Sequence, residues 1–261
     1  MTPLLAAILL GAVQGVTEFL PVSSTAHLAA LPVLFGWSDP LLRSQAFDAV
    51  LHLGTLGALL AVFGAEWGRL LSGLARPATV DGRLAWGLVL ATLPALAAGA
   101  LLEHVVADRL RTPHAIAGFL AAGAVILWAA DARRPGTGVA RSLGWRDAVL
   151  IGCAQAFAIL PGLSRSGMTI SAGLALGLSR AEAARYAFLL SAPIIAAAGL
   201  WESRHLAGLG GGDAALLATG IAVAALTGAI AIRWFLRVIA RIGLLPFAIY
   251  RFLLALVLLA Q

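Results

Sequence analysis

The residues of this chain that could do chemistry gather in two short stretches of an otherwise apolar sequence. The first stretch, residues 14–27, reads Gln-Gly-Val-Thr-Glu-Phe-Leu-Pro-Val-Ser-Ser-Thr-Ala-His, and the second, residues 161–169, reads Pro-Gly-Leu-Ser-Arg-Ser-Gly-Met-Thr. A carboxylate, an imidazole, a guanidinium and several hydroxyls are each costly inside a bilayer, and such intramembrane groups usually mark a functional site. The two stretches together predict one polar site.

The first stretch supplies candidate acid–base and nucleophilic groups. Gln14 and Glu18 are four residues apart, which places both side chains on one face of a helix. A buried Glu18 could act as base or acid or hold a divalent cation, and the alternative is a carboxylate that only caps the next turn. Ser24 and His27 follow a proline, where a new helix would begin. His27 could be a nucleophile, base or acid at phosphorus, although a lone histidine is often only a satisfied polar residue.

The second stretch centres on Arg165. A permanently charged guanidinium inside a membrane needs a partner, and its fork matches the oxygens of a phosphate. The alternative is a structural ion pair with Glu18. The hydroxyls and the glycine amides beside Arg165 could form an anion-binding nest at a helix N-terminus. The expected guest is therefore a phosphate or a carboxylate.

The composition shows what kind of scaffold must hold these residues. Of the 261 residues, 61% are hydrophobic and 11% are charged, whereas a soluble domain has about 25% charged residues. The apolar residues come in long runs and do not alternate with polar ones, so an all-α integral membrane protein is expected. The net charge of +6 comes from arginine alone, because the chain has no lysine. This excludes a lysine-bearing P-loop, and the absence of a basic stripe argues against a nucleic-acid partner.

Periodicity and helix breakers predict six membrane spans and two re-entrant hairpins. The spans are expected at 46–65, 84–102, 115–130, 186–201, 214–235 and 244–260. Two pairs of shorter segments, 3–20 with 22–36 and 148–160 with 166–178, are interrupted by proline or glycine at the polar stretches. Irregular backbone at membrane depth is tolerated only around a protein-lined or water-filled cavity. Each pair is therefore expected to be a helical hairpin with its tip at the site.

Arginines in the loops predict the orientation. The loops 66–83, 131–147 and 233–241 are rich in arginine, which makes them cytoplasmic by the positive-inside rule and puts both termini outside. The two hairpins then enter from opposite sides of the membrane. We therefore expect a single polytopic domain, 1–261, formed by an inverted-topology repeat with halves of approximately 1–130 and 131–261.

The polar stretches resemble the two motifs of the undecaprenyl-diphosphate phosphatase family, a group of bacterial cell-envelope enzymes linked with bacitracin resistance. Residues 14–27 are similar to the glutamate-rich first motif of that family, and residues 161–169 to its arginine-bearing second motif. Less distinctive similarities lie at 47–55, 186–193 and 244–252. The resemblance thus runs nearly from end to end.

The resemblance implies a phosphoanhydride hydrolase of the bacterial cytoplasmic membrane. It would convert undecaprenyl diphosphate to undecaprenyl phosphate and inorganic phosphate at the outer face, which recycles the lipid carrier for peptidoglycan and other envelope polymers. The catalytic residues implied are Glu18, Ser24, His27 and Arg165. The residues expected to bind the diphosphate are Gln14, Ser23, Thr25, Ser164, Arg165, Ser166, Gly167 and Thr169.

One position departs from the pattern of some family members. Gln14 stands where those members have glutamate. A glutamine is neither a base nor an anionic ligand, so a two-carboxylate metal site is not supported. Glu18 remains a candidate ligand for a divalent cation, Mg²⁺ or Ca²⁺, and no organic cofactor is expected.

Several alternatives remain open in the sequence. The nucleophile could be His27, Ser24 or water. Inverted repeats with broken helices also form secondary transporters, so a transporter or flippase of an anionic lipid or phosphate-bearing substrate is the alternative function. A histidine and a serine beside Glu18 favour the hydrolase, because anion transport requires positive charge but no nucleophile.

Other residues carry weaker signals. Asp48 and His52 begin the first full span, where they could line the cavity or lie at the membrane interface. The expected partners are a polyprenyl diphosphate substrate and membrane lipid, with a homodimer as a further expectation. Six glycines could allow close helix packing within one chain or between two: Gly57, Gly87, Gly99, Gly118, Gly123 and Gly220.

Overall fold

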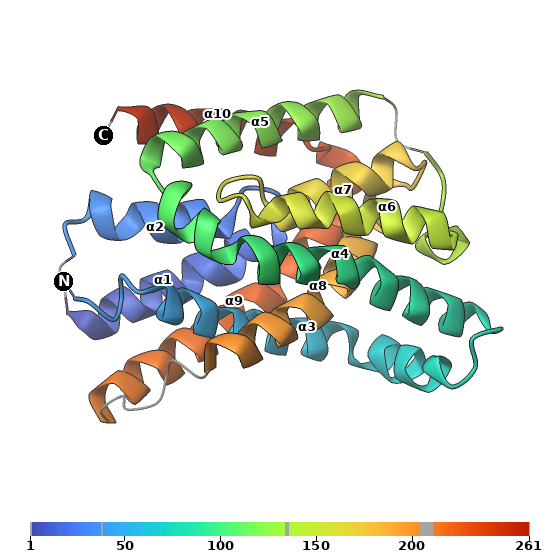
Figure 1. Cartoon of the computed structure of the whole chain (residues 1–261), viewed down its shortest axis with the longest axis horizontal. Coiled ribbons are helices and arrows are strands. Elements are labelled where there is room, and N and C mark those ends of the chain that lie inside the picture. Colours follow the sequence, from blue (N-terminus) through green and yellow to red (C-terminus); the bar gives the residue numbers. More distant parts are fainter. Residues whose placement is uncertain (1, 38, 134–135, 204–210, 261) are drawn as a thin grey trace.

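Helices account for nearly all of the regular structure of the chain. The computed structural model describes residues 2–37, 39–133, 136–203 and 211–260, and these ranges contain no β-strand. The α-helices are α1 (Pro3–Phe19), α2 (Ser24–Leu34), α3 (Gln45–Leu74), α4 (Val80–Arg109), α5 (Pro113–Ala132), α6 (Trp145–Ala156), α7 (Arg165–Ala175), α8 (Arg180–Ser203), α9 (Gly211–Ile242) and α10 (Leu245–Leu259). Two short 3-10 helices, η1 (Ala140–Ser142) and η2 (Phe157–Ile159), complete the set (Figure 1).

Among the described residues, five helices are long and apolar enough to cross a membrane. They cover Ala46–Leu74, Val80–Val106, Pro113–Ala132, Arg180–Trp201 and Asp213–Ile242. These five agree with the spans expected from the sequence, and the chain is a multi-pass, all-α membrane protein. The sixth expected span, 244–260, agrees in position with α10. This helix has 15 residues, about 22 Å of helix at 1.5 Å per residue, whereas the hydrocarbon core is about 30 Å thick.

Side-chain caps define where the long helices begin. Ser44 accepts a hydrogen bond from the backbone N–H of Phe47 at the start of α3, over 3.0 Å. Thr79 accepts one from Gly82 at the start of α4, also over 3.0 Å. Such caps satisfy N–H groups that have no partner within the helix. They fix where each long helix leaves its loop.

The two expected helix breaks are present, and they share an unusual backbone. In the described ranges, Ser23 (φ 73°) and Ser164 (φ 68°) are the non-glycine residues with positive φ. Each serine directly precedes a helix that starts at a break, α2 after Ser23 and α7 after Ser164. A left-handed conformation costs a non-glycine residue about 1–3 kcal/mol and persists only where the surroundings impose it. Such residues cluster at functional sites.

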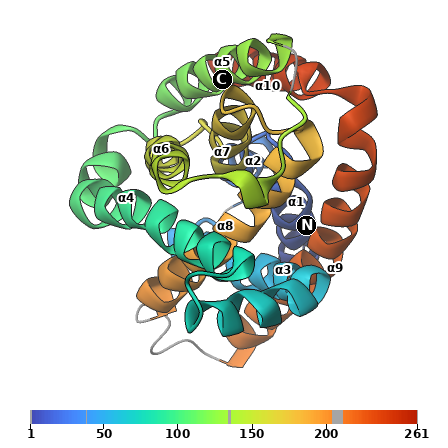
Figure 2. The ribbon, with the colours of Figure 1, turned by 90° about the vertical axis from the view of Figure 1, so that its right-hand side faces the viewer.

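The short helices lie among the long ones. In Figure 2, α2 and α7 lie inside a ring formed by α3, α4, α5, α9 and α10. Helix α1 packs along α9, and α10 packs along α5 (Figure 1). The first pair approaches closely at Gly11, where an added Cβ would lie 2.5 Å from the carbonyl oxygen of Gly220. This arrangement holds the tips of both breaks in the interior of the bundle.

Candidate active site

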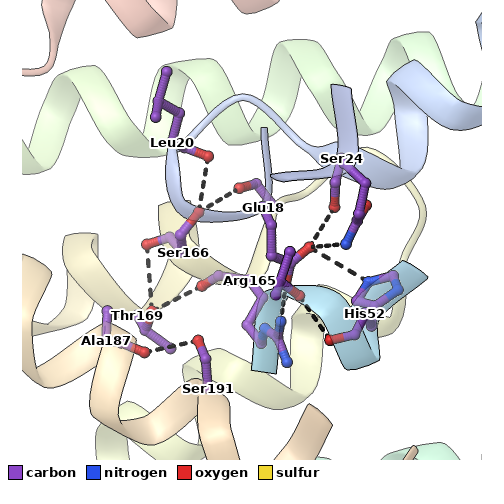
Figure 3. Close-up of polar contacts among 12 residues, drawn as sticks. Glu18, Leu20, Ser24, His52, Arg165, Ser166, Thr169, Ala187 and Ser191 are labelled. Carbon is purple, nitrogen blue, oxygen red and sulfur yellow. Dashed lines mark hydrogen bonds and ion pairs between the residues drawn. The ribbon is translucent and has the colours of Figure 1, made fainter. Parts of the chain in front are cut away.

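The carboxylate of Glu18 is the centre of the polar site. Glu18 lies near the end of α1 and is 7% exposed. Its Oε2 accepts hydrogen bonds from Nε2 of Gln14 (3.1 Å) and from Oγ of Ser24 (2.7 Å). Its Oε1 forms an ion pair with Nη2 of Arg165 (Figure 3). Residues from two distant stretches of the sequence therefore meet at one buried carboxylate.

Both breaks aim their first helical residue at this carboxylate. Ser24 is the first residue of α2, and Arg165 is the first residue of α7. Ser164 caps α7 by accepting a hydrogen bond from the N–H of Gly167 over 3.2 Å. The strained turns before α2 and α7 thus point a hydroxyl and a guanidinium at Glu18.

Three of the residues expected to bind the diphosphate lie in the first turns of α7, where Ser166 and Thr169 hydrogen-bond to backbone carbonyls. Ser166 donates its hydroxyl hydrogen to the carbonyl of Leu20 over 3.0 Å, which ties the second turn to the first (Figure 3). Thr169 donates to the carbonyl of Arg165 over 2.8 Å. A Cβ on Gly167 would lie 2.8 Å from Nη1 of Arg251, so a side chain there would crowd that guanidinium. The structure buries all three beside the site.

His52, for which the sequence left open a place in the cavity wall or at the membrane interface, lies in the wall of the cavities beside Glu18. Its Nε2 lies 3.3 Å from Oε2 of Glu18 (Figure 3). Its Nδ1 lies 2.7 Å from the carbonyl oxygen of Asp48. The carbonyl can only accept, so Nδ1 carries the hydrogen and Nε2 is the nitrogen that faces the carboxylate. The sequence signal was the position of His52 on a membrane span, four residues after Asp48, but that spacing does not reveal the partner.

His27 lies away from Glu18 in the structure. Its Nδ1 is 2.7 Å from the carbonyl oxygen of Ser23, and its Nε2 is 2.6 Å from the hydroxyl oxygen of Tyr250 on α10. The two rings stack with centroids 5.6 Å apart. His27 is absent from the walls of the cavities next to Glu18. The structure therefore brings Gln14, Glu18, Ser24 and Arg165 together but not His27.

Two adjoining cavities give the site room for a ligand. One, of about 260 Å³, is lined by Glu18, Ser24 and Arg165, together with Ser23, Thr25, Ser164 and Gln155. The other, of about 280 Å³, is lined by charged groups that include Asp48, Glu103 and Arg111. Thr25, His52 and Arg165 line both cavities. Arg165 can thus pair with Glu18 and still face the space where an anion would lie.

A buried arginine braces the two turns from behind. Arg251 is 0% exposed and donates to the carbonyls of Pro21 (3.4 Å), Gly162 (2.9 Å), Leu163 (3.0 Å) and Leu120 (3.3 Å). Pro21 belongs to the first turn, and Gly162 and Leu163 belong to the second. One side chain of α10 therefore links both turns.

The side chains around Glu18 do not by themselves form a binding site for a divalent cation. Mg²⁺ takes six oxygen ligands and Ca²⁺ takes six to eight. Both oxygens of Glu18 already accept from donors, one of which is a guanidinium. Across the described ranges, no group of three His, Cys, Asp or Glu side chains is placed to hold a metal.

Comparison with known proteins finds relatives that match nearly the whole length of this chain. It is 44% identical to undecaprenyl-diphosphatase 2 of Stutzerimonas stutzeri, over 98% of this chain and 97% of that protein. It is 45% identical to undecaprenyl-diphosphatase of Pelotomaculum thermopropionicum, over 94% of this chain and 91% of that protein. The corresponding protein of Myxococcus xanthus is 43% identical, over 98% and 88%.

The family resemblance is therefore much broader than the two polar motifs. The sequence model of the family described as bacitracin resistance protein BacA matches residues 7–257, a range that includes both turns and all the residues around Glu18. The chain belongs to the bacitracin resistance protein BacA family.

Proposed function

We propose that this protein hydrolyses undecaprenyl diphosphate to undecaprenyl phosphate and inorganic phosphate, and so recycles the lipid carrier of envelope polymers. We propose this activity because the relatives of the chain are named undecaprenyl-diphosphatases. The observation that carries it is the hydroxyl of Ser24 held 2.7 Å from a carboxylate that also pairs with Arg165. A nucleophile, a base and an anion-binding cation thus share one buried site. Nothing in those names supports the transporter alternative.

The geometry favours Ser24 as the nucleophile. In the first step, Oγ of Ser24 bonds to the terminal phosphorus, its hydrogen passes to Oε2 of Glu18, and the bridging P–O bond breaks. Undecaprenyl phosphate leaves with the bridging oxygen. In the second step, water attacks the phosphoserine and the P–Oγ bond breaks. Glu18 returns its hydrogen to Oγ of Ser24, the attacking water releases one hydrogen to solvent, and inorganic phosphate leaves. Arg165 balances the negative charge in both steps, as preorganised cations do in phosphoryl transfer.

A divalent cation stays part of the proposal only as a group that arrives with the substrate. Mg²⁺ is commonly bound through one or two carboxylates together with substrate phosphates. Glu18 is the carboxylate that would share it. Its chemistry there would be charge neutralisation on the phosphate oxygens.

We also propose that the chain crosses the membrane six times, through the five long helices and the shorter α10. Two re-entrant hairpins complete an inverted repeat. Each half, 1–130 and 131–261, holds one helix break, and the left-handed Ser23 and Ser164 are 141 positions apart. Packing repeats too, because α1 contacts α9 as α6 contacts α4. These correspondences support hairpins that enter from opposite sides.

We further propose that the site opens to the outer face of the bacterial cytoplasmic membrane, with both termini outside. The arginine-rich loops support this orientation. It can be tested by replacing Cys153, the single cysteine, with serine and introducing one cysteine at Thr2 or Ala78. A membrane-impermeant maleimide on intact cells should label the cysteine at position 2, and labelling only at position 78 would reverse the orientation.

Phosphate release from undecaprenyl diphosphate by the purified protein tests the activity. The wild type should release phosphate, and Ser24→Ala and Arg165→Ala should each lower kcat by at least about a thousandfold. Ser72→Ala and Arg76→Ala are matched controls on the α3 end and its loop and should keep full activity. A wild type that releases no phosphate would overturn the proposed function. Full activity in Ser24→Ala would leave hydrolysis in place but remove the serine nucleophile.

A further inference from the structure

We propose that the first isoprene units of the lipid substrate lie in an apolar groove between α4 and α8. This inference rests on the proposed function and extends it to the binding of the hydrocarbon chain. The groove has a volume of about 370 Å³. Its walls are mainly aliphatic and aromatic side chains, and among the described residues Glu103 is the one charged residue in its lining. Such a lining suits a hydrocarbon chain and offers little to a polar ligand.

The groove is continuous with the cavity beside Glu18. Ala95 and Gly99 of α4 and Ile194 and Ala198 of α8 line both spaces. A diphosphate bound at Arg165 would therefore direct its ester oxygen, and the first carbons attached to it, into the groove. This continuity identifies the occupant as the chain of the same molecule whose headgroup lies in the cavity.

The other end of the groove reaches the surface of the helix bundle. Leu96 is 38% exposed and Trp201 is 52% exposed, and both line the groove. They belong to two membrane-spanning helices, Val80–Val106 and Arg180–Trp201. A hydrocarbon chain leaving the groove would pass between two apolar membrane-spanning helices into lipid, where its burial continues.

Gly99 determines how much space the hydrocarbon chain of the substrate has in the groove. A Cβ on Gly99 would meet no atom within 4 Å, so the glycine is not there for close helix packing, one of the expectations from the sequence. It leaves open space where the headgroup cavity meets the groove. A pocket of 300–1,000 Å³ holds a drug-sized ligand, so the groove accepts only the proximal units and the rest of the chain stays in the bilayer.

A bulky side chain at position 99 tests the groove without disturbing the fold. Gly99→Leu should raise KM for undecaprenyl diphosphate by at least about tenfold, because the lost burial of one isoprene unit is worth more than that factor. The control is Gly118→Leu on α5, since a Cβ on Gly118 also meets no atom within 4 Å and Gly118 lines none of these cavities. Both changes favour helix formation.

Photolabelling gives a readout that does not depend on turnover. A polyprenyl diphosphate with a diazirine on its first isoprene unit should label peptides of α4 and α8 in the wild type and lose that labelling in Gly99→Leu. Labelling of α5 and α10 and not of α4 and α8 would overturn the proposal that the isoprene units lie in the groove. Full activity of both the wild type and Gly99→Leu would also overturn the proposed groove, but it would leave the proposed function standing. An inactive wild type would overturn the proposed function itself.

Discussion

Nε2 of His52 lies 3.3 Å from Oε2 of Glu18, the oxygen that also accepts the hydroxyl hydrogen of Ser24. One carboxylate oxygen thus connects the proposed nucleophile with an imidazole whose other nitrogen is fixed by the carbonyl of Asp48. His52 lines both cavities of the site and is the histidine next to the proposed chemistry. His27 is held instead by Ser23 and Tyr250.

We predict that His52→Gln lowers kcat about a hundredfold, the lower range of acid–base contributions. Glutamine keeps a polar side chain there but, unlike the imidazole, cannot exchange a proton with Oε2 of Glu18. His27→Gln is the matched control and should lower kcat less than His52→Gln. The measurement is kcat and KM for undecaprenyl diphosphate across a pH series, in which only His52→Gln should change the shape of the profile. A larger loss in His27→Gln would instead support the catalytic role that the family resemblance implies for His27.

Arg251 should matter for both stability and activity. In Arg251→Met the carbonyls of Pro21, Gly162 and Leu163 lose their donor, and leaving buried polar groups unpaired costs about 1–3 kcal/mol each. We expect a fall of at least about 3 kcal/mol in the free energy of unfolding, together with a lower kcat, since Ser24 and Arg165 follow these turns.

Thermal unfolding in detergent measures the stability effect of Arg251→Met. The control is Arg237→Met, at an exposed position of α9, which should stay within about 0.5 kcal/mol of the wild type. Equal stability of Arg251→Met and Arg237→Met would show that Arg251 does not brace the turns.

The left-handed serines predict an unusual order of substitution effects. Ser23→Ala should be less stable than Ser23→Gly by about 1 kcal/mol, because alanine pays for positive φ and glycine does not. The same order is expected at Ser164, where both variants also lose the cap on the N–H of Gly167. Unfolding temperatures of the four variants measure the effect. If alanine proved as stable as glycine at both positions, the turns would not impose this conformation.

Metal binding should depend on the substrate. Isothermal titration of substrate-free protein with Mg²⁺ or Ca²⁺ should show no saturable binding at millimolar concentrations, because both oxygens of Glu18 already accept from other groups. Addition of a non-hydrolysable diphosphate lipid should create binding through the phosphate oxygens. Saturable binding to the free protein that disappears in Glu18→Gln would place a resident cation at Glu18.

The sequence predicted the helix breaks and the two polar stretches because proline, glycine and buried charge leave strong local signals. Five of the six expected spans agree with the long apolar helices, and α10 (Leu245–Leu259) lies where the sixth was expected but is only 15 residues long. The partners of single side chains could not be predicted. His27 and Ser24 are three residues apart, yet one contacts α10 and the other contacts α1.

The partner of His52 could not be predicted either, although in this case the structure adds a residue to the surroundings of Glu18. Its contact with Glu18 depends on how α1 and α3 pack, which periodicity does not reveal. Gly99 was one of six glycines expected to allow close packing, and only the three-dimensional arrangement distinguishes a glycine that touches a neighbour from one that borders open space.

Ser24 and Arg165 start their helices at positions 141 residues apart, the separation that also relates Gln14 to Gln155 and Ser23 to Ser164. Two matching turns with identical residues would have set like against like, hydroxyl against hydroxyl or cation against cation. Because the two turns differ at this pair of positions, one carries the hydroxyl proposed as the attacking group and the other carries a cation that can attract the substrate. The proposed reaction centre therefore needs both halves of the chain, and neither half alone could form it.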